Sequence, residues 1–91
     1  MTVFDPESAW KLSSQVSVRP EPFGALLYHF GTRKLSFLKD RTLVQIVESL
    51  RDQPSARAAI VAAGVAEPYQ DVYIRAVSSL VDSNMVVAQE A

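Results

Sequence analysis

The stretch that decides the fold is Gly24-Ala-Leu-Leu-Tyr-His-Phe30, followed by Gly31-Thr32 and Arg33-Lys-Leu-Ser-Phe-Leu38. Two runs rich in strand-forming residues flank a short loop that contains glycine, which is the pattern of a β-hairpin. A two-residue loop with glycine in its first position suits a type II′ turn. That loop would pair Tyr28 with Leu35 and Leu26 with Phe37, and a four-residue loop would preserve the same parity.

The hairpin has two unlike faces, because successive side chains of a strand point in opposite directions. One face is apolar and largely aromatic, and it carries Leu26, Tyr28, Phe30, Leu35 and Phe37. The other face is mixed, and it carries Ala25, Leu27, His29, Lys34, Ser36 and Leu38. We therefore expect the first helix to cover the aromatic face and the mixed face to be partly exposed.

The residues on either side of the hairpin predict a further strand and a helix. Upstream, the run 16–19 alternates apolar and polar residues before prolines interrupt it, which predicts a short strand. Downstream, Asp40 is a suitable N-cap, and apolar residues follow at helical spacing up to the turn before Pro54. These residues are Leu43, Ile46, Val47 and Leu50.

Two more helices are predicted in the remaining sequence. Ser55 can cap a helix over residues 56–63, with Gly64 as its stop. A third helix is expected from about Pro68 to Ser83, with Asn84 as its stop. Residues 85–87 are compatible with a short final strand.

The predicted fold is α+β, with a three-stranded antiparallel sheet followed by three helices. The last two helices are joined by a short turn, which gives a winged helix-turn-helix-like layout. We expect residues 1–8 to be a flexible N-terminus, 9–88 to form a single domain, and 89–91 to be a tail.

The composition is that of a globular protein, with 48% hydrophobic and 21% charged residues among 91. A net charge of −1 gives no general attraction to nucleic acid or anionic lipid. The N-terminus lacks the zones of a signal peptide, and no apolar run is long enough to span a bilayer. We expect a cytoplasmic protein.

The sequence offers no constellation of catalytic residues. It has no cysteine and only one histidine, His29. Because His29 lies on a predicted strand between two aromatic residues, we expect it to be a packing or surface residue and not a catalytic base. Its glycines are too widely spaced to hold a phosphate. We therefore expect no enzyme activity, no cofactor and no metal site.

Several motifs together resemble a known family. They are Val16-Ser-Val-Arg-Pro-Glu, Gly24-Ala-Leu-Leu, Leu35-Ser-Phe-Leu, Thr42-Leu-Val-Gln-Ile-Val, Asp71-Val72, Leu80 and Asn84-Met-Val. In this set the chain is similar to the PqqD-like recognition elements, which bind precursor peptides of ribosomally made natural products. More narrowly, the twenty residues from Arg19 to Leu38 resemble the signature of the peptide-binding chaperones of mycofactocin biosynthesis.

The resemblance implies a non-catalytic chaperone. Such proteins bind the leader of a precursor peptide and present it to a radical S-adenosylmethionine (SAM) maturase. The leader would add as a strand to the third predicted strand and lie in a groove against the third helix. The residues that the resemblance places at this site are Arg33, Lys34, Leu35, Ser36, Phe37 and Leu38 on the strand and Val72, Tyr73, Ala76 and Ser79 on the helix.

The predicted edge strand also carries a basic cluster. Four of the nine basic residues are Arg33, Lys34, Lys39 and Arg41. Lysine on an edge strand guards against self-association, and positive charge attracts acidic peptides, so both roles stay open. If an incoming strand uses the amide of Ser36, proline at this position should weaken peptide capture more than folding.

The alternative function is that of a winged-helix DNA-binding domain in a small regulator. Against it, the polar positions of the third helix include two acids and one base, which would meet phosphates poorly. These positions are Gln70, Asp71, Arg75, Ser78, Ser79 and Asp82. A structural adaptor or dimerisation module would share the fold. We expect neither nucleic acid nor membrane as a partner.

Overall fold

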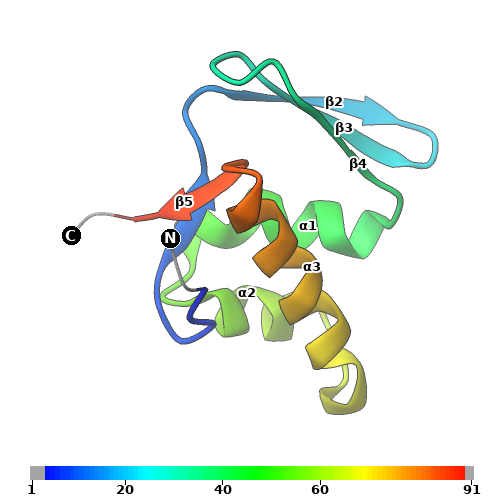
Figure 1. Cartoon of the computed structure of the whole chain (residues 1–91). Helices are drawn as coiled ribbons and strands as arrows, with labels where there is room; N and C mark the ends of the chain where they lie inside the picture. Colours follow the sequence, from blue (N-terminus) through cyan, green and yellow to red (C-terminus); the bar gives the residue numbers. More distant parts are fainter. Residues whose placement is uncertain (1–3, 90–91) are drawn as a thin grey trace.

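The computed structural model describes residues 4–89, and Figure 1 shows a sheet lying over a layer of helices. The strands are β1 (Trp10–Leu12), β2 (Val16–Glu21), β3 (Gly24–His29), β4 (Leu35–Leu38) and β5 (Val86–Ala88). The helices are α1 (Arg41–Ser49), α2 (Ala56–Ala62) and α3 (Gln70–Asp82), with short 3-10 turns at Leu50–Asp52 and Glu67–Tyr69. The predicted α+β class is confirmed, with β2, β3 and β4 forming a three-stranded antiparallel sheet.

The predicted helix ends are confirmed by their capping contacts. The Asp40 carboxylate accepts from the Thr42 amide at the start of α1, and the Ser55 hydroxyl accepts from the Ala58 amide at the start of α2. Gly64 follows α2 with a φ of 84°, and Asn84 follows α3 with a φ of 62°. These left-handed residues end their helices because the chain cannot continue the right-handed helix through them.

The predicted register of the β3–β4 hairpin is confirmed, with Tyr28 opposite Leu35 and Leu26 opposite Phe37. The predicted two-residue type II′ turn is wrong. The Arg33 amide donates to the His29 carbonyl at 2.7 Å, and Arg33, with a φ of 62°, is the left-handed residue of the turn. Two extra residues in the loop leave the register unchanged, because side chains alternate with period two.

The prediction that α1 covers the aromatic face of the hairpin is wrong. Ala25 and Leu27 are fully buried and Leu38 is 2% exposed, so the mixed face packs on the helices. Leu35, Phe37 and Phe30 are each more than half exposed on the opposite face. The aromatic face is therefore the outer surface of the sheet.

The pairing of β2 explains this reversal. Val18 lies opposite Leu27, whereas Arg19 lies opposite Leu26. Paired residues share a face, so Val16 and Val18 extend the side that carries Leu27, and Arg19 extends the side that carries Leu26. Burying the aromatic side would also bury the charge of Arg19, which is costlier than exposing aromatic rings.

The core lies between the inner face of the sheet and the three helices. Its largest fully buried side chains include Leu27, Ile46, Ile60 and Met85, which come from β3, α1, α2 and the segment after α3. Gly24 lets β3 approach β4 closely, because a Cβ at this position would lie 2.0 Å from the Leu38 carbonyl oxygen. The same glycine has a φ of 150°, which other residues rarely adopt.

A second small sheet joins the two ends of the described chain, with β1 antiparallel to β5. Trp10 is 3% exposed, and its indole N–H donates to the Asp5 carbonyl. The Ser8 carbonyl accepts from the Ala56 amide, and the Pro6 carbonyl accepts from the Arg57 amide. The segment predicted to be a flexible N-terminus thus contacts the first turn of α2 where it is described, and residues 1–3 lie outside the described residues.

Within residues 4–89, none of the helices combines the length and the apolar character that a membrane crossing requires.

Candidate functional site

One long side of β4 has no partner among residues 4–89. The strand order is β2-β3-β4, so β4 pairs with β3 on one side only. This is the strand on which the resemblance places the incoming peptide. An edge strand presents a row of backbone donors and acceptors to whatever lies beside it.

The register shows which backbone groups of β4 point outward. The His29 amide donates to the Lys34 carbonyl at 3.0 Å, so residues 29 and 34 form a hydrogen-bonded pair. Such pairs alternate with non-bonded pairs along an antiparallel ladder. Ser36 therefore directs its backbone groups to β3, and Leu35 and Phe37 direct theirs to the free edge.

The expectation that an incoming strand uses the amide of Ser36 is therefore wrong. That amide lies on the β3 side of the strand, opposite Leu27. The donors available to a new strand are the amides of Leu35 and Phe37. The sequence could not reveal this, because the alternation of the ladder becomes fixed only when the turn is closed by its own hydrogen bonds.

The side chains of the predicted strand site differ in their exposure. Arg33, Lys34, Leu35 and Phe37 are exposed, and Ser36 is half-buried. Leu38 is 2% exposed and belongs to the core. Leu38 thus anchors the end of β4, while its neighbours remain accessible to a ligand.

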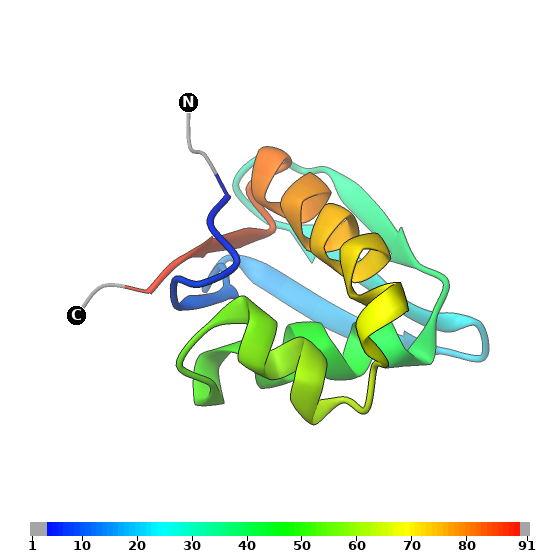
Figure 2. The same cartoon turned by 90° about the horizontal axis from the view of Figure 1, so that it is seen from below.

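The predicted helix residues form a partly exposed stripe on α3. Val72 is 59% exposed, Ser79 is exposed, and Tyr73 and Ala76 are half-buried. The buried residues of α3 are Val77, Leu80 and Val81, and Tyr73, one turn before Val77, packs against the core. Val72, Ala76 and Ser79 therefore form the more exposed part of the stripe. Figure 2, which views the helices from below, shows α3 under the β4 side of the sheet. The two predicted parts of the site are therefore on the same side of the molecule.

A hydrogen bond ties α3 to the end of β4. The Tyr73 hydroxyl donates to Asp40 Oδ2 at 2.5 Å, and Asp40 lies between β4 and α1. This bond lowers the pKa of Asp40, the Thr42 amide acts in the same direction, and partial burial opposes both. The same bond raises the pKa of Tyr73. Tyr73 is thus a fixed boundary of the site.

A pocket of about 350 Å³ lies beside Tyr73. It shares Tyr73 with the predicted groove but contains no residue of β4. It sits among the start of α1, the α2–α3 connection and the start of α3. Its lining residues are Thr42, Ala63, Gly64, Val65, Ala66, Tyr69 and Tyr73.

The basic cluster surrounds β4 as the sequence predicts. Arg33 and Lys34 precede the strand, Lys39 and Arg41 follow it, and all four are exposed. The ion pairs found within residues 4–89 are Arg19–Glu21 and Arg57–Glu7, so none of the four basic side chains is in an ion pair there. Asp40 is the acidic residue within the cluster, and its carboxylate accepts from the Tyr73 hydroxyl and the Thr42 amide. The free edge is locally positive.

His29 has a structural role in the turn. Its side chain is 7% exposed, and its Nδ1 accepts hydrogen bonds from the amides of Gly31 and Thr32 at 3.0 and 3.1 Å. The ring therefore satisfies turn amides that would otherwise lack partners. This agrees with the interpretation of His29 as a packing residue.

The comparisons with known proteins identify the family. The family model described as "Peptide chaperone MftB family" matches residues 9–87. The chain belongs to the MftB family. The resemblance to the peptide chaperones of mycofactocin biosynthesis is thereby confirmed, and peptide chaperones are not enzymes.

Curated relatives of this MftB-family chain cover most of its length, and each is named peptide chaperone MftB. The relative from Mycolicibacterium smegmatis is 64% identical over 84 residues, which are 92% of this chain and 82% of the relative. The relative from Mycobacterium ulcerans is 59% identical over 97% of this chain and 81% of its own length. The relative from Mycobacterium tuberculosis is 58% identical over 96% of this chain and 80% of its own length. No solved structure matches the chain.

Two features of the site in this MftB-family chain were missed in the sequence. One is the contact between Tyr73 and Asp40, which are 33 positions apart and carry no signal of their proximity. The other is the exposure of the aromatic face. The alternation of Val16, Ser17, Val18 and Arg19 was a signal for it, because this strand must place its valines inside.

Proposed function

We propose that this MftB-family chaperone binds the leader of its precursor peptide as an additional strand on β4 and presents the peptide to a radical SAM maturase. The observation that carries the proposal is the free edge of β4, where the backbone groups of Leu35 and Phe37 point away from β3. Strand addition uses such groups for affinity and neighbouring pockets for selectivity.

The surroundings of β4 support a peptide as the ligand. The stripe of Val72, Ala76 and Ser79 on α3 is accessible on the same side of the molecule, and Tyr73 is held at its margin. The side chains of an added strand that point inward would face this stripe. The positive charge around β4 favours a peptide with acidic residues.

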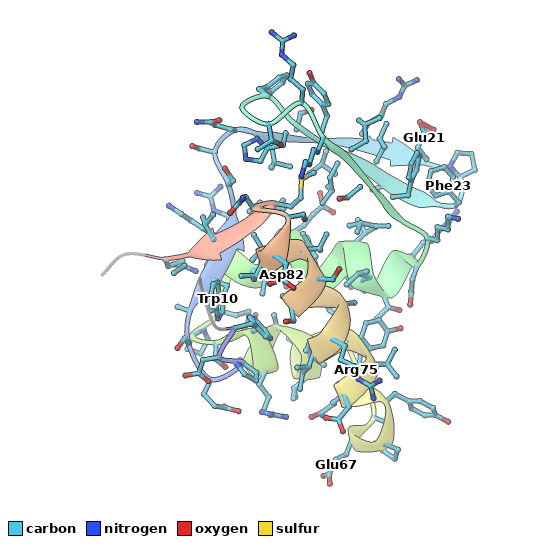
Figure 3. The ribbon with its side chains drawn as sticks, viewed as in Figure 1. Trp10, Glu21, Phe23, Glu67, Arg75 and Asp82 are labelled. Atoms are coloured by element: carbon cyan, nitrogen blue, oxygen red, sulfur yellow. The ribbon has the colours of Figure 1, made fainter. Side chains whose placement is uncertain are left out.

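The helix α3 is a poor recognition helix for DNA. Figure 3 shows Arg75 and Asp82 along α3, and Asp71 is exposed in its first turn. Acidic groups on this surface would repel phosphates. The alternative of a DNA-binding regulator predicts a salt-dependent shift of duplex DNA in a gel, and we expect no shift at the concentrations at which peptide binds.

Amide hydrogen exchange tests the proposed strand addition. Labelled protein is compared with and without the synthetic precursor peptide of mycofactocin biosynthesis. We expect the amides of Leu35 and Phe37 to exchange rapidly in the free protein and at least tenfold more slowly in the complex, because they gain hydrogen-bond partners. Ser36 is the internal control, since its amide already lies in the ladder with β3. Maturase added to the complex tests the presentation of the peptide.

Protection elsewhere on the protein, with no change at residues 35 and 37, would contradict binding at this edge. If the protein bound the maturase equally well with and without peptide, this result would contradict the presentation of the peptide. It would leave the strand addition on β4 unaffected.

A further inference from the structure

The outer face of the sheet exposes a group of large apolar side chains, which we call the outer apolar face. Phe23, Phe30, Leu35 and Phe37 are 43%, 59%, 53% and 58% exposed, respectively, and Leu26 and Tyr28 are half-buried among them. Exposed apolar groups of this kind are often functional in a small protein. Neither the core nor the α3 stripe uses this surface.

The rings of the outer apolar face contact one another. Phe23 and Phe37 have their ring centroids 6.1 Å apart, and Tyr28 and Phe30 meet edge to face at 5.1 Å. Figure 3 shows Phe23 next to Glu21 at the end of the sheet formed by the β2–β3 turn. These contacts order the aromatic rings beside β4 before a ligand binds. Binding therefore costs little further side-chain entropy.

We propose that the outer apolar face reads every second side chain of the bound peptide through Leu35, Phe37 and Phe23. This inference rests on the proposed strand addition. In an antiparallel ladder, the side chains of paired residues point to the same face. The peptide residues opposite Leu35 and Phe37 therefore lie on the outer apolar face, whereas the residues between them point toward α3.

The charge around the surface favours a peptide over a second copy of the chain. Three phenylalanines and a leucine that are about half exposed present roughly 400 Å², which two or three apolar side chains of a strand can cover. Two copies that met through this face would bring the exposed basic residues around β4 of one copy close to those of the other. Such a juxtaposition of like charges opposes association.

The charges at the two ends of β4 further restrict which peptides fit this surface. Arg33 and Lys34 precede the apolar pair Leu35 and Phe37, and Lys39 follows it. The ligand chemistry that fits is an extended segment with apolar residues at alternate positions and acidic residues at its ends. Both faces of the added strand then contribute to selectivity. One face contacts the outer apolar face, and the other contacts the α3 stripe.

The test is the double variant Leu35→Thr with Phe37→Thr. Threonine keeps strand propensity and leaves the backbone donors in place, so the edge remains able to pair. We expect its affinity for the synthetic precursor peptide, measured by calorimetry, to fall at least tenfold. Val61→Thr on α2, which removes a 56% exposed apolar side chain far from β4 in sequence, is the control and should bind normally.

A peptide scan locates the interaction. Alanine at the apolar peptide positions opposite Leu35 and Phe37 should weaken binding to the wild-type protein and have little further effect on the double variant. Hydrogen exchange at saturating peptide should still show protection at residues 35 and 37 of the variant.

Each other outcome overturns the inference and shows what replaces it. Unchanged peptide affinity with lost maturase association would assign the outer apolar face to the maturase. Unchanged peptide affinity with loss of a wild-type dimer would assign it to a second copy. Absent protection at residues 35 and 37 of the wild-type complex would remove the proposed function and this inference together, whereas protection with unchanged affinity would remove this inference alone.

Discussion

At the scale of single residues, Tyr73 and Asp40 show how one polar contact organises the site. Asp40 caps α1 through the Thr42 amide and accepts the hydroxyl of Tyr73 from α3. One carboxylate thus connects the end of β4, the start of α1 and the first turn of α3. Charge-assisted hydrogen bonds of this kind are stronger than neutral ones.

Tyr73→Phe should remove about 1 kcal/mol of stability at neutral pH, because the carboxylate loses its strongest hydrogen bond. The pKa of Asp40 is lowered below 3.8 in the folded protein, so this contribution is present above pH 3.8 and is lost as the pH falls through the folded pKa. Urea unfolding at pH 7 and near pH 2 measures the difference between wild type and variant.

Tyr69→Phe serves as the control for this measurement, because Tyr69 is 64% exposed. An equal loss of stability by Tyr73→Phe at both pH values would contradict the role of the ionised carboxylate.

At the scale of elements, the odd-numbered and even-numbered residues of β4 have different roles. Its odd-numbered residues, Leu35 and Phe37, have exposed side chains and backbone groups at the free edge. Its even-numbered residues, Ser36 and Leu38, face the core side and pair with β3. The even-numbered residues of this four-residue strand therefore hold it in the sheet, and the odd-numbered residues leave their backbone groups free for a partner.

Proline substitutions should reveal this parity. Ser36→Pro removes a hydrogen bond of the β3–β4 ladder and should cost about 1–3 kcal/mol of stability. Leu35→Pro removes an amide that faces the free edge, so it should fold with a smaller loss and bind the precursor peptide at least tenfold more weakly than Leu35→Thr. Urea unfolding and calorimetry measure the two effects. The opposite order of stabilities would show that the assignment of inward and outward amides is reversed.

At the scale of the whole molecule, the charge is uneven although the net charge is only −1. Arg33, Lys34, Lys39 and Arg41 surround β4 without an ion pair among the described residues. Such a local field speeds the encounter with an acidic ligand and contributes less to final affinity.

Reversing two of these charges, Arg33→Glu with Lys34→Glu, should slow association with the precursor peptide about tenfold at low salt and leave thermal stability nearly unchanged. The effect should diminish as salt rises, because exposed charges are screened. Stopped-flow kinetics across a salt series measures it. Lys11→Glu with Arg51→Glu makes the same change of charge at exposed residues of β1 and the turn after α1. Equal rates for wild type and both variants would leave protection against self-association as the remaining role of the cluster.

The fold and the candidate site were predictable to different degrees. The helix caps at Asp40 and Ser55, the stops at Gly64 and Asn84, and the β3–β4 register follow from local rules of capping, left-handed conformation and alternation. The family could be recognised because twenty consecutive residues carry its signature. These features depend on neighbours in the chain, so the sequence by itself determined them.

Only the tertiary structure decided which face of the hairpin is buried, which amides of β4 remain free, and that Tyr73 meets Asp40. The period of a strand separates two faces without saying which one the helices cover. That choice depends on the pairing with β2, whose Arg19 shares a face with Leu26 and whose Val18 shares one with Leu27. Burial is settled by the free energy of the whole fold, in which exposing aromatic rings costs less than burying the charge of Arg19.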